Sequence, residues 1–225
     1  MNIFALACHP KAAAALHCDQ HVRKMIIETA QMLYTFLHRL RLIPRFRELT
    51  KDLVDADGNA LEPYKPTHEH HPCQLWLHGG RSHYLWLASL GMHLCWRYEE
   101  IYGKTHKTAV HIKALLAFGA GFLAYLPDDC WPAEWLRRLA AIGESPGSIA
   151  SCAAKVCLAD PPTNCHFGVA CMGDETVPLE TDEHGHASTI YSYRSLMGHK
   201  QAVDLKNMRW AKQDEVPLAL TDWVL

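Results

Sequence analysis

Between residues 19 and 42, polar and apolar positions recur with a helical period, and their proportions are unusual. At about 100° per residue, one narrow stripe contains five polar side chains: His21, Lys24, Glu28, Gln31 and Thr35. Most of the other positions from Val22 to Leu40 are apolar. A surface helix usually shows the reverse, a narrow apolar stripe on a polar body. We therefore expect a mostly buried helix, capped by Asp19 and ending near Leu42, whose polar stripe faces a cleft.

The polar stripe has two interpretations. Buried His, Lys and Glu side chains are costly unless they are paired or bind a ligand, which favours a functional site. Lys24 and Glu28 are also four residues apart, so they can form a self-contained ion pair on a solvent-facing edge. The sequence leaves both interpretations open.

The same periodicity predicts a second long helix that packs against the first. Apolar residues three and four positions apart run from His83 to about Tyr102, after a Ser82 cap. Thr108 can cap a further helix from Ala109 to Leu126.

Shorter elements complete the expected fold. Helices are expected at 11–17, from Pro72, from Trp131 to Gly143 and at 188–201, and the apolar run 2–7 has the length of a strand. A change of composition at 144–148 divides a helical core, about 10–143, from a smaller C-terminal portion, about 148–225. We expect one mostly α-helical domain with a minor strand component.

Composition restricts the function classes. The chain has 225 residues with a formal net charge of −2, so it does not resemble a duplex binder held by bulk positive charge, although a local basic patch is compatible. Nine cysteines without a visible secretory signal suggest free thiols in a reducing cytosol. No apolar run reaches the roughly 18 residues of a membrane span, so we expect no membrane partner.

Several chemical motifs are incomplete. Gly103-Lys104-Thr105 lacks the preceding glycine of a phosphate loop, because Tyr98 occupies that position. No histidine or cysteine spacing matches a common zinc motif, and we predict neither a metal nor a cofactor. Cys18 lies at a helix start, where a thiol pKa can fall, so a cysteine nucleophile is a minor alternative.

Basic residues gather at two places. The end of the first long helix is basic, through His38, Arg39, Arg41, Arg45 and Arg47; cations there suit the helix dipole or form a phosphate-binding edge. Lys104, His106 and Lys107 cluster between two helix ends, where free N–H groups also favour an anion.

The chain resembles a family of small helical proteins encoded by tailed bacteriophages. The resemblance rests on four segments: CDQHVRKM with ETAQML at 18–33, YKPTH with HPC at 64–73, Trp76 with Tyr84, and YGKTH at 102–106. The pattern is similar to the amino acid:DNA transferases of thymidine hypermodification, which are held to join an amino acid to a thymine methylene activated as a pyrophosphate ester. His78, Gly80 and His83 stand where that pattern usually has Arg, Ser and Asn.

This resemblance implies roles for the polar residues. Glu28 or His21 would deprotonate the incoming amine, and Lys24, Lys104, His106 and Arg81 would bind the leaving pyrophosphate. Gln31 would contact the pyrimidine edge, Tyr84 or Trp76 would stack on the base, and His71 would complete the site. We therefore expect the stripe, His71 and Lys104–His106 to converge in space.

The expected function is a transferase that joins an amino acid or amine to an activated 5-hydroxymethyl pyrimidine in DNA, in the host-cell cytoplasm. The target base would be flipped from the duplex, with local DNA contacts through the arginines at 39–47 or the lysines at 104–113. A DNA glycosylase or lyase is one alternative. A non-catalytic phage protein that binds nucleic acid or a host protein is another.

Overall fold

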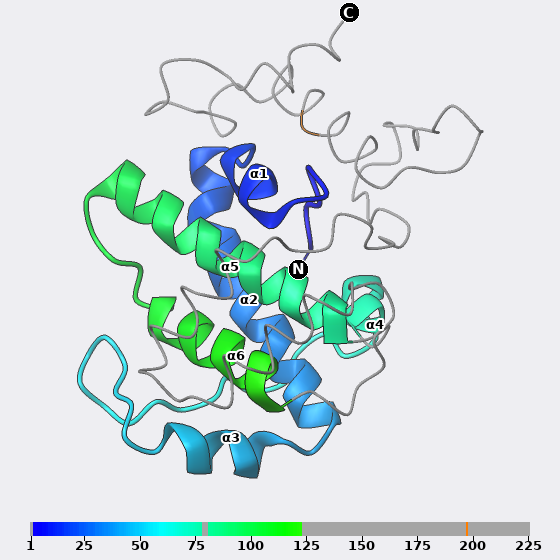
Figure 1. Cartoon of the computed structure of the whole chain (residues 1–225), viewed down its shortest axis with the longest axis vertical. Coiled ribbons are helices and arrows are strands. Elements are labelled where there is room, and N and C mark those ends of the chain that lie inside the picture. Colours follow the sequence, from blue (N-terminus) through cyan, green and yellow to red (C-terminus); the bar gives the residue numbers. More distant parts are fainter. Residues whose placement is uncertain (1, 78–80, 123–196, 198–225) are drawn as a thin grey trace, which may run out of the picture.

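Six helices make up the part of the chain that the structure describes (Figure 1). The computed structural model describes residues 2–77, 81–122 and 197. The helices are α1 (Pro10–Ala15), α2 (Asp19–Arg39), α3 (Ile43–Thr50), α4 (Pro72–Leu77), α5 (Arg81–Tyr102) and α6 (Ala109–Phe122). The fold is a mostly α-helical single domain, as the sequence predicts. The helices expected at 131–143 and 188–201 and the C-terminal portion lie outside the described residues.

The first long helix is buried over most of its surface. Six consecutive residues, Met32 to Leu37, are buried, and α5, α6, α3 and α4 all pack against α2. The helix begins one residue earlier than predicted. Cys18 occupies the N-cap position that we expected for Asp19, and Asp19 is the first helical residue. An acidic residue in the first turn still complements the helix dipole.

The end of α2 comes three residues before the predicted Leu42. Arg41 adopts a left-handed backbone conformation, with φ at 57°. The N–H of Leu42 donates to Leu37 O at 2.9 Å and that of Arg41 donates to His38 O at 3.0 Å. These two bonds form a Schellman motif, which usually has glycine in the left-handed position. Because the residue in this position is an arginine, the sequence does not indicate that the helix ends here.

The predicted strand at 2–7 is absent. The N–H groups of Ala5 and Leu6 bond to carbonyls only two residues earlier, at 3.1 and 3.0 Å, so this segment forms tight turns. Ile3 to Leu6 are nevertheless buried against the helices. The strand component of the described residues is a single antiparallel bridge, between Val54 and Ala60.

The two long helices run antiparallel. Tyr102, at the end of α5, donates its hydroxyl to Asp19 O at 3.2 Å, at the start of α2. At the opposite ends, the rings of Phe36 and Tyr84 lie 5.2 Å apart between centroids. In the described part of the chain, no helix combines the length and the apolar character required to cross a membrane.

Glycines allow α6 to approach α5 closely. A Cβ added at Gly119 would lie 2.7 Å from Cδ1 of Tyr84 and 3.1 Å from Cδ2 of Leu85. The Tyr84 ring is fully buried, and its hydroxyl donates to Leu115 O at 3.1 Å. The ring therefore has no room to withdraw.

We predict that Gly119→Ala destabilises the protein by roughly 1–3 kcal/mol, as expected for an overpacked core. At a solvent-exposed helical position the same change usually stabilises by up to about 1 kcal/mol. Urea unfolding measures the difference. In a Tyr84→Leu background the penalty should shrink, because the ring that the new methyl group would strike is gone. An unchanged penalty in that background would contradict this packing.

Two buried histidines are held neutral by the fold. His17 is fully buried, with Nδ1 2.7 Å from Ala13 O, and burial lowers its pKa to about 4. His111 contacts the hydroxyl of Tyr34 through Nδ1 at 2.8 Å, and burial lowers its pKa to about 4 as well. Because the unfolded chain binds these protons near pH 6.5, acid favours unfolding.

We predict that the titration of these two histidines leaves the free energy of unfolding unchanged above pH 6.5. It lowers the free energy of unfolding as the pH drops from 6.5 toward 4. Each histidine can contribute up to about 3 kcal/mol to the fall. Urea titrations at pH 7.5 and 5.0 measure it, and His17→Leu should reduce the pH dependence. His70→Gln, which replaces an exposed imidazole, is the control. Equal pH dependence in all three proteins would refute the prediction.

Candidate functional site

Glu28 is a polar residue of the α2 stripe that contacts both its own helix and a distant segment. Its Oε2 accepts the backbone N–H of Asn2 at 2.9 Å, and its Oε1 lies 3.4 Å from Lys24 Nζ. The Lys24 side chain is 64% exposed, whereas that of Glu28 is 12% exposed. The structure thus contains the i,i+4 ion pair of the simpler interpretation. The structure also contains a contact between Glu28 and Asn2, which is 26 residues earlier in the sequence.

Asn2 connects Glu28 to the segment that begins α4. Its Oδ1 accepts the thiol of Cys73 at 3.4 Å, while the N–H of Cys73 donates to Nδ1 of His71 at 3.2 Å. Burial lowers the pKa of His71 below its ordinary value, and the negative charge of Glu28 acts in the opposite direction. His71 and the stripe therefore lie close enough to interact, as the sequence predicts.

An open depression of about 600 Å³ adjoins this cluster. It is lined by Pro66, Thr67, His68, Glu69, His70 and His71. The stripe holds one wall in place, since the N–H of Thr67 donates to Oγ1 of Thr35 at 3.1 Å. Farther along α2, Nη1 of Arg39 donates to Glu69 O at 2.8 Å. The expected cleft is thus a surface depression beside the C-terminal half of α2.

The other stripe residues become more buried along the helix. His21 is half-buried and stacks on Phe4, with ring centroids 4.8 Å apart. Gln31 is half-buried, and Thr35 is fully buried. His21 therefore packs against the N-terminal segment, whereas Gln31 lies between Glu28 and the depression along the helix.

The expected convergence is wrong for Lys104–His106. The α5 helix has 22 residues, which corresponds to about 33 Å. Figure 1 shows α4 at one end of this helix and the connection to α6 at the other. His106 packs edge-on against Tyr98 at 4.8 Å, and burial lowers its pKa. The antiparallel arrangement of α2 and α5 separates this segment from His71.

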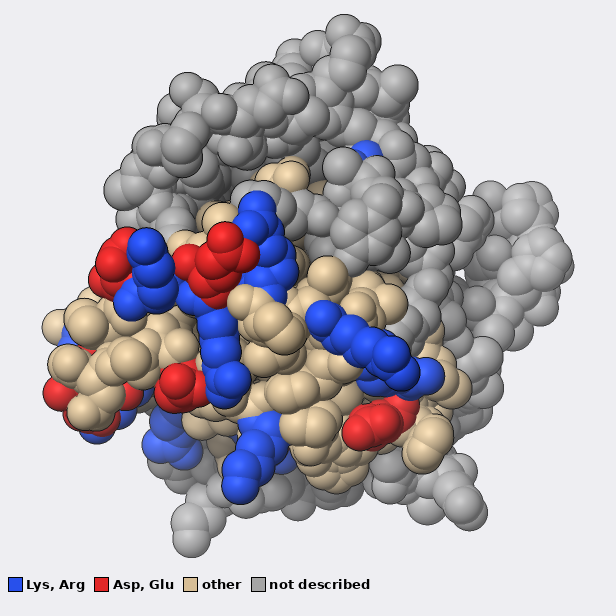
Figure 2. All heavy atoms as spheres, turned by 90° about the horizontal axis from the view of Figure 1, so that it is seen from below, with Lys and Arg blue, Asp and Glu red and all other residues tan. Residues whose placement is uncertain are grey.

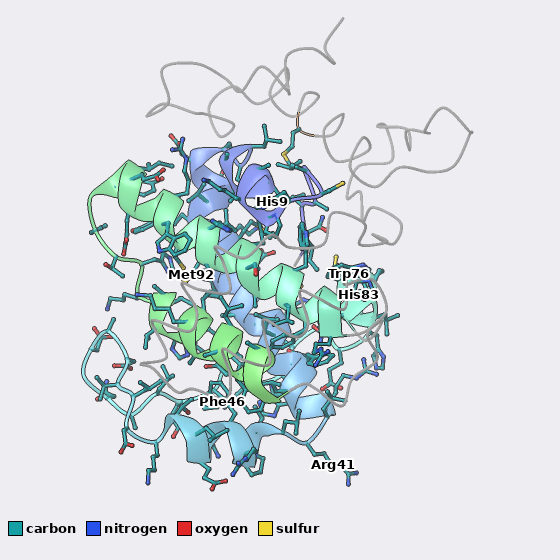
Figure 3. The ribbon with its side chains drawn as sticks, viewed as in Figure 1. His9, Arg41, Phe46, Trp76, His83 and Met92 are labelled. Atoms are coloured by element: carbon teal, nitrogen blue, oxygen red, sulfur yellow. The ribbon has the colours of Figure 1, made fainter. Side chains whose placement is uncertain are left out.

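Tyr84 and Arg81 lie at the other end of α5, near α4. Because Tyr84 is fully buried and donates its hydroxyl to Leu115 O, it cannot stack on a base in this structure, and its expected role is corrected. Arg81 is the first residue of α5 and is 8% exposed. Trp76 is half-buried and lies 4.5 Å from His83 between ring centroids (Figure 3). Trp76 is the better placed of the two proposed stacking residues.

Gln74 is a candidate that the sequence reasoning missed. It lies three residues after His71, and its side chain is completely buried. Neither its amide oxygen nor its amide nitrogen has a hydrogen-bond partner in the structure. An unsatisfied buried amide is costly, and this cost makes Gln74 a candidate functional residue. A lone polar residue between Cys73 and Leu75 in a short apolar helix was the available signal.

The cysteine alternative receives no support from geometry. Cys18 is fully buried, and burial raises the pKa of its thiol, which opposes thiolate formation. Among the described residues, no three His, Cys, Asp or Glu side chains gather closely enough to hold a metal ion.

Comparison of the chain with protein families, with curated proteins and with solved structures finds no match. The site is therefore interpreted from its own geometry.

We predict that Glu28→Gln lowers the pKa of His71 further, because it removes the negative charge that favours the imidazolium. The glutamine oxygen can still accept the Asn2 N–H, so the packing should persist. An NMR titration of the His71 ring protons measures the change. Glu100→Gln, an exposed position on α5, is the matched control. A His71 pKa that rises or stays constant would show that the two groups do not interact.

Proposed function

We propose that the protein is a phage DNA-modifying transferase that joins an amino acid or amine to an activated 5-hydroxymethyl pyrimidine in DNA. The observation that supports this proposal is the Glu28 carboxylate, 12% exposed and near His71, beside an open depression. Such a carboxylate can accept a proton from a substrate amine bound in the depression. The resemblance to the phage transferases supplies the reaction class.

The proposed reaction is a substitution at the exocyclic methylene carbon. The amine nitrogen forms a bond to this carbon with its lone pair, while the bond from carbon to the pyrophosphate oxygen breaks. Pyrophosphate leaves with that electron pair. The proton lost by the amine passes to Oε1 of Glu28, because Oε2 already accepts the Asn2 N–H. His71, whose pKa is lowered by burial, is the second candidate base.

The leaving group needs nearby cations. Lys24 is the best placed, since its Nζ is 3.4 Å from Glu28 and its side chain is largely exposed. His68 and His70 line the depression and can donate hydrogen bonds to phosphate oxygens. Lys104 and His106 are not assigned to this site, because they lie at the far end of α5.

The proposed partners are DNA and a free amino acid or amine, with no cofactor, in the cytoplasm of the infected host. The target base would have to leave the helical stack to reach the depression. The volume of the depression, about 600 Å³, is within the range of small-molecule sites and is compatible with one pyrimidine and an amine.

We predict that Glu28→Gln reduces transfer by roughly 10²–10⁴-fold, the usual contribution of a general base. The assay uses a duplex with one 5-(pyrophosphoryloxymethyl)uracil and a mixture of amino acids and polyamines. Mass spectrometry of the released nucleosides detects the adduct. Glu100→Gln removes one carboxylate from α5 without touching the depression and should leave the rate unchanged.

The same assay separates the alternatives. A glycosylase or lyase would release a free base or nick the strand, and a binding protein would leave the substrate intact. Either result with the wild-type protein would overturn the transferase proposal. Full activity in Glu28→Gln would remove Glu28 from the mechanism.

A further inference from the structure

We propose that the exposed cations at the α2–α3 end of the molecule form a binding surface for a nucleic-acid backbone, continuous with the depression. We call this set the α3 basic surface: Arg39, Arg41, Arg45, Arg47, Lys51 and Lys65. The identity of the ligand rests on the proposed function, whereas the surface itself rests on charge and geometry.

The charge of this surface contrasts with the whole chain. Residues 39–51 contain five exposed Lys and Arg side chains and one acidic residue, Glu48, in a chain whose net charge is −2. Figure 2 looks at the molecule from the α3 side and shows Lys and Arg side chains spread over this face, with acidic side chains among them. Such a local concentration is what a near-neutral nucleic-acid-binding protein requires.

Half of these cations make no ion pair within the described part of the chain. Arg41, Lys51 and Lys65 make no ion pair with any described residue. Arg45 pairs with Glu48 at 2.6 Å and Arg47 pairs with Glu62 at 2.8 Å, but all four side chains are about half exposed or more. Exposed pairs of this kind contribute about 0–1 kcal/mol, so phosphate groups can replace the carboxylates at little cost.

The surface adjoins the depression through direct contacts. Arg39 donates to the carbonyl of Glu69, a residue that lines the depression. His38 contacts the carbonyl of Tyr64 through Nε2 at 3.1 Å, so Lys65 is held where the wall begins. A strand held by these cations would pass directly beside the place proposed for the modified base.

The helix dipole does not account for the whole surface. It favours cations only in the last turn of a helix, which covers Arg39 and Arg41 at the end of α2 and Arg47 and Lys51 at the end of α3. Arg45 lies near the start of α3, and Lys65 lies in an extended segment. Arg41 is also held in a left-handed conformation at the outer edge of this face (Figure 3). A backbone ligand explains all of these positions together.

The test measures binding of the full-length protein to an unmodified 20-base-pair duplex by fluorescence anisotropy, over a range of salt concentrations. The variant is Arg41→Gln with Lys65→Gln, because neither side chain forms an ion pair with the residues that the structure describes. We expect Kd at 0.1 M salt to rise roughly tenfold or more, and the slope of log Kobs against log salt to fall by about 2.

The matched control is Lys11→Gln with Arg23→Gln. It removes the same charge from exposed positions on α1 and the first turns of α2, at the opposite end of the molecule from α3 (Figure 1). Equal weakening by both variants would mean that binding follows net charge, and it would overturn the α3 basic surface. Binding of polyglutamate as tightly as DNA would also overturn it.

The outcome is separable from that of the proposed function, because the binding assay contains neither an activated base nor an amine. A selective loss of DNA binding without any transferase activity would support the surface and refute the enzyme. Transferase activity together with equal DNA binding by both variants would support the enzyme and refute the α3 basic surface.

Discussion

The fold depends on the burial of α2 on nearly every side. A helix with six consecutive buried residues, from Met32 to Leu37, needs neighbours around its whole circumference, and α3, α4, α5 and α6 supply them. The polar stripe is most exposed at Lys24, while His21, Glu28 and Gln31 are half-buried. Beyond Gln31, Thr35 is fully buried and bonds to Thr67. The core thus decides where the polar stripe can meet a ligand.

An extended segment completes the enclosure of α2 and forms the candidate site. Residues 62–71 cannot become helical easily, because Pro63 and Pro66 restrict their neighbours. Their backbone groups bond to side chains of α2 instead, through Thr35, His38 and Arg39. The same three contacts position the wall of the depression, on which His71 lies, and the start of the α3 basic surface. One structural requirement, the satisfaction of an irregular backbone, therefore places all three features next to one another.

Helical periodicity predicted the class of fold and the starts of α4 and α6, because these depend on local residues. It did not predict the end of α2, since Arg41 replaces the glycine expected in a Schellman motif. It also failed where the outcome depended on tertiary pairing: Tyr84 entered the core, and the antiparallel arrangement placed the segment after Tyr102 near the start of α2, away from His71. Asn2 and Gln74 gave no periodic signal. Sequence can place residues on one face of one helix, but it does not specify which ends of two helices meet.

The position of Glu28 is difficult to explain by stability alone. Its ion pair with Lys24 is largely exposed on the lysine side, and such pairs contribute little. Keeping a carboxylate 12% exposed carries a desolvation cost, of which the Asn2 N–H repays a part through one oxygen. Leucine or glutamine at this position would avoid that cost. A partly desolvated carboxylate with one oxygen held by a backbone N–H and the other 3.4 Å from an exposed lysine is, however, compatible with the general base that we propose. The structural and functional demands on this residue differ, and its surroundings correspond to the functional one.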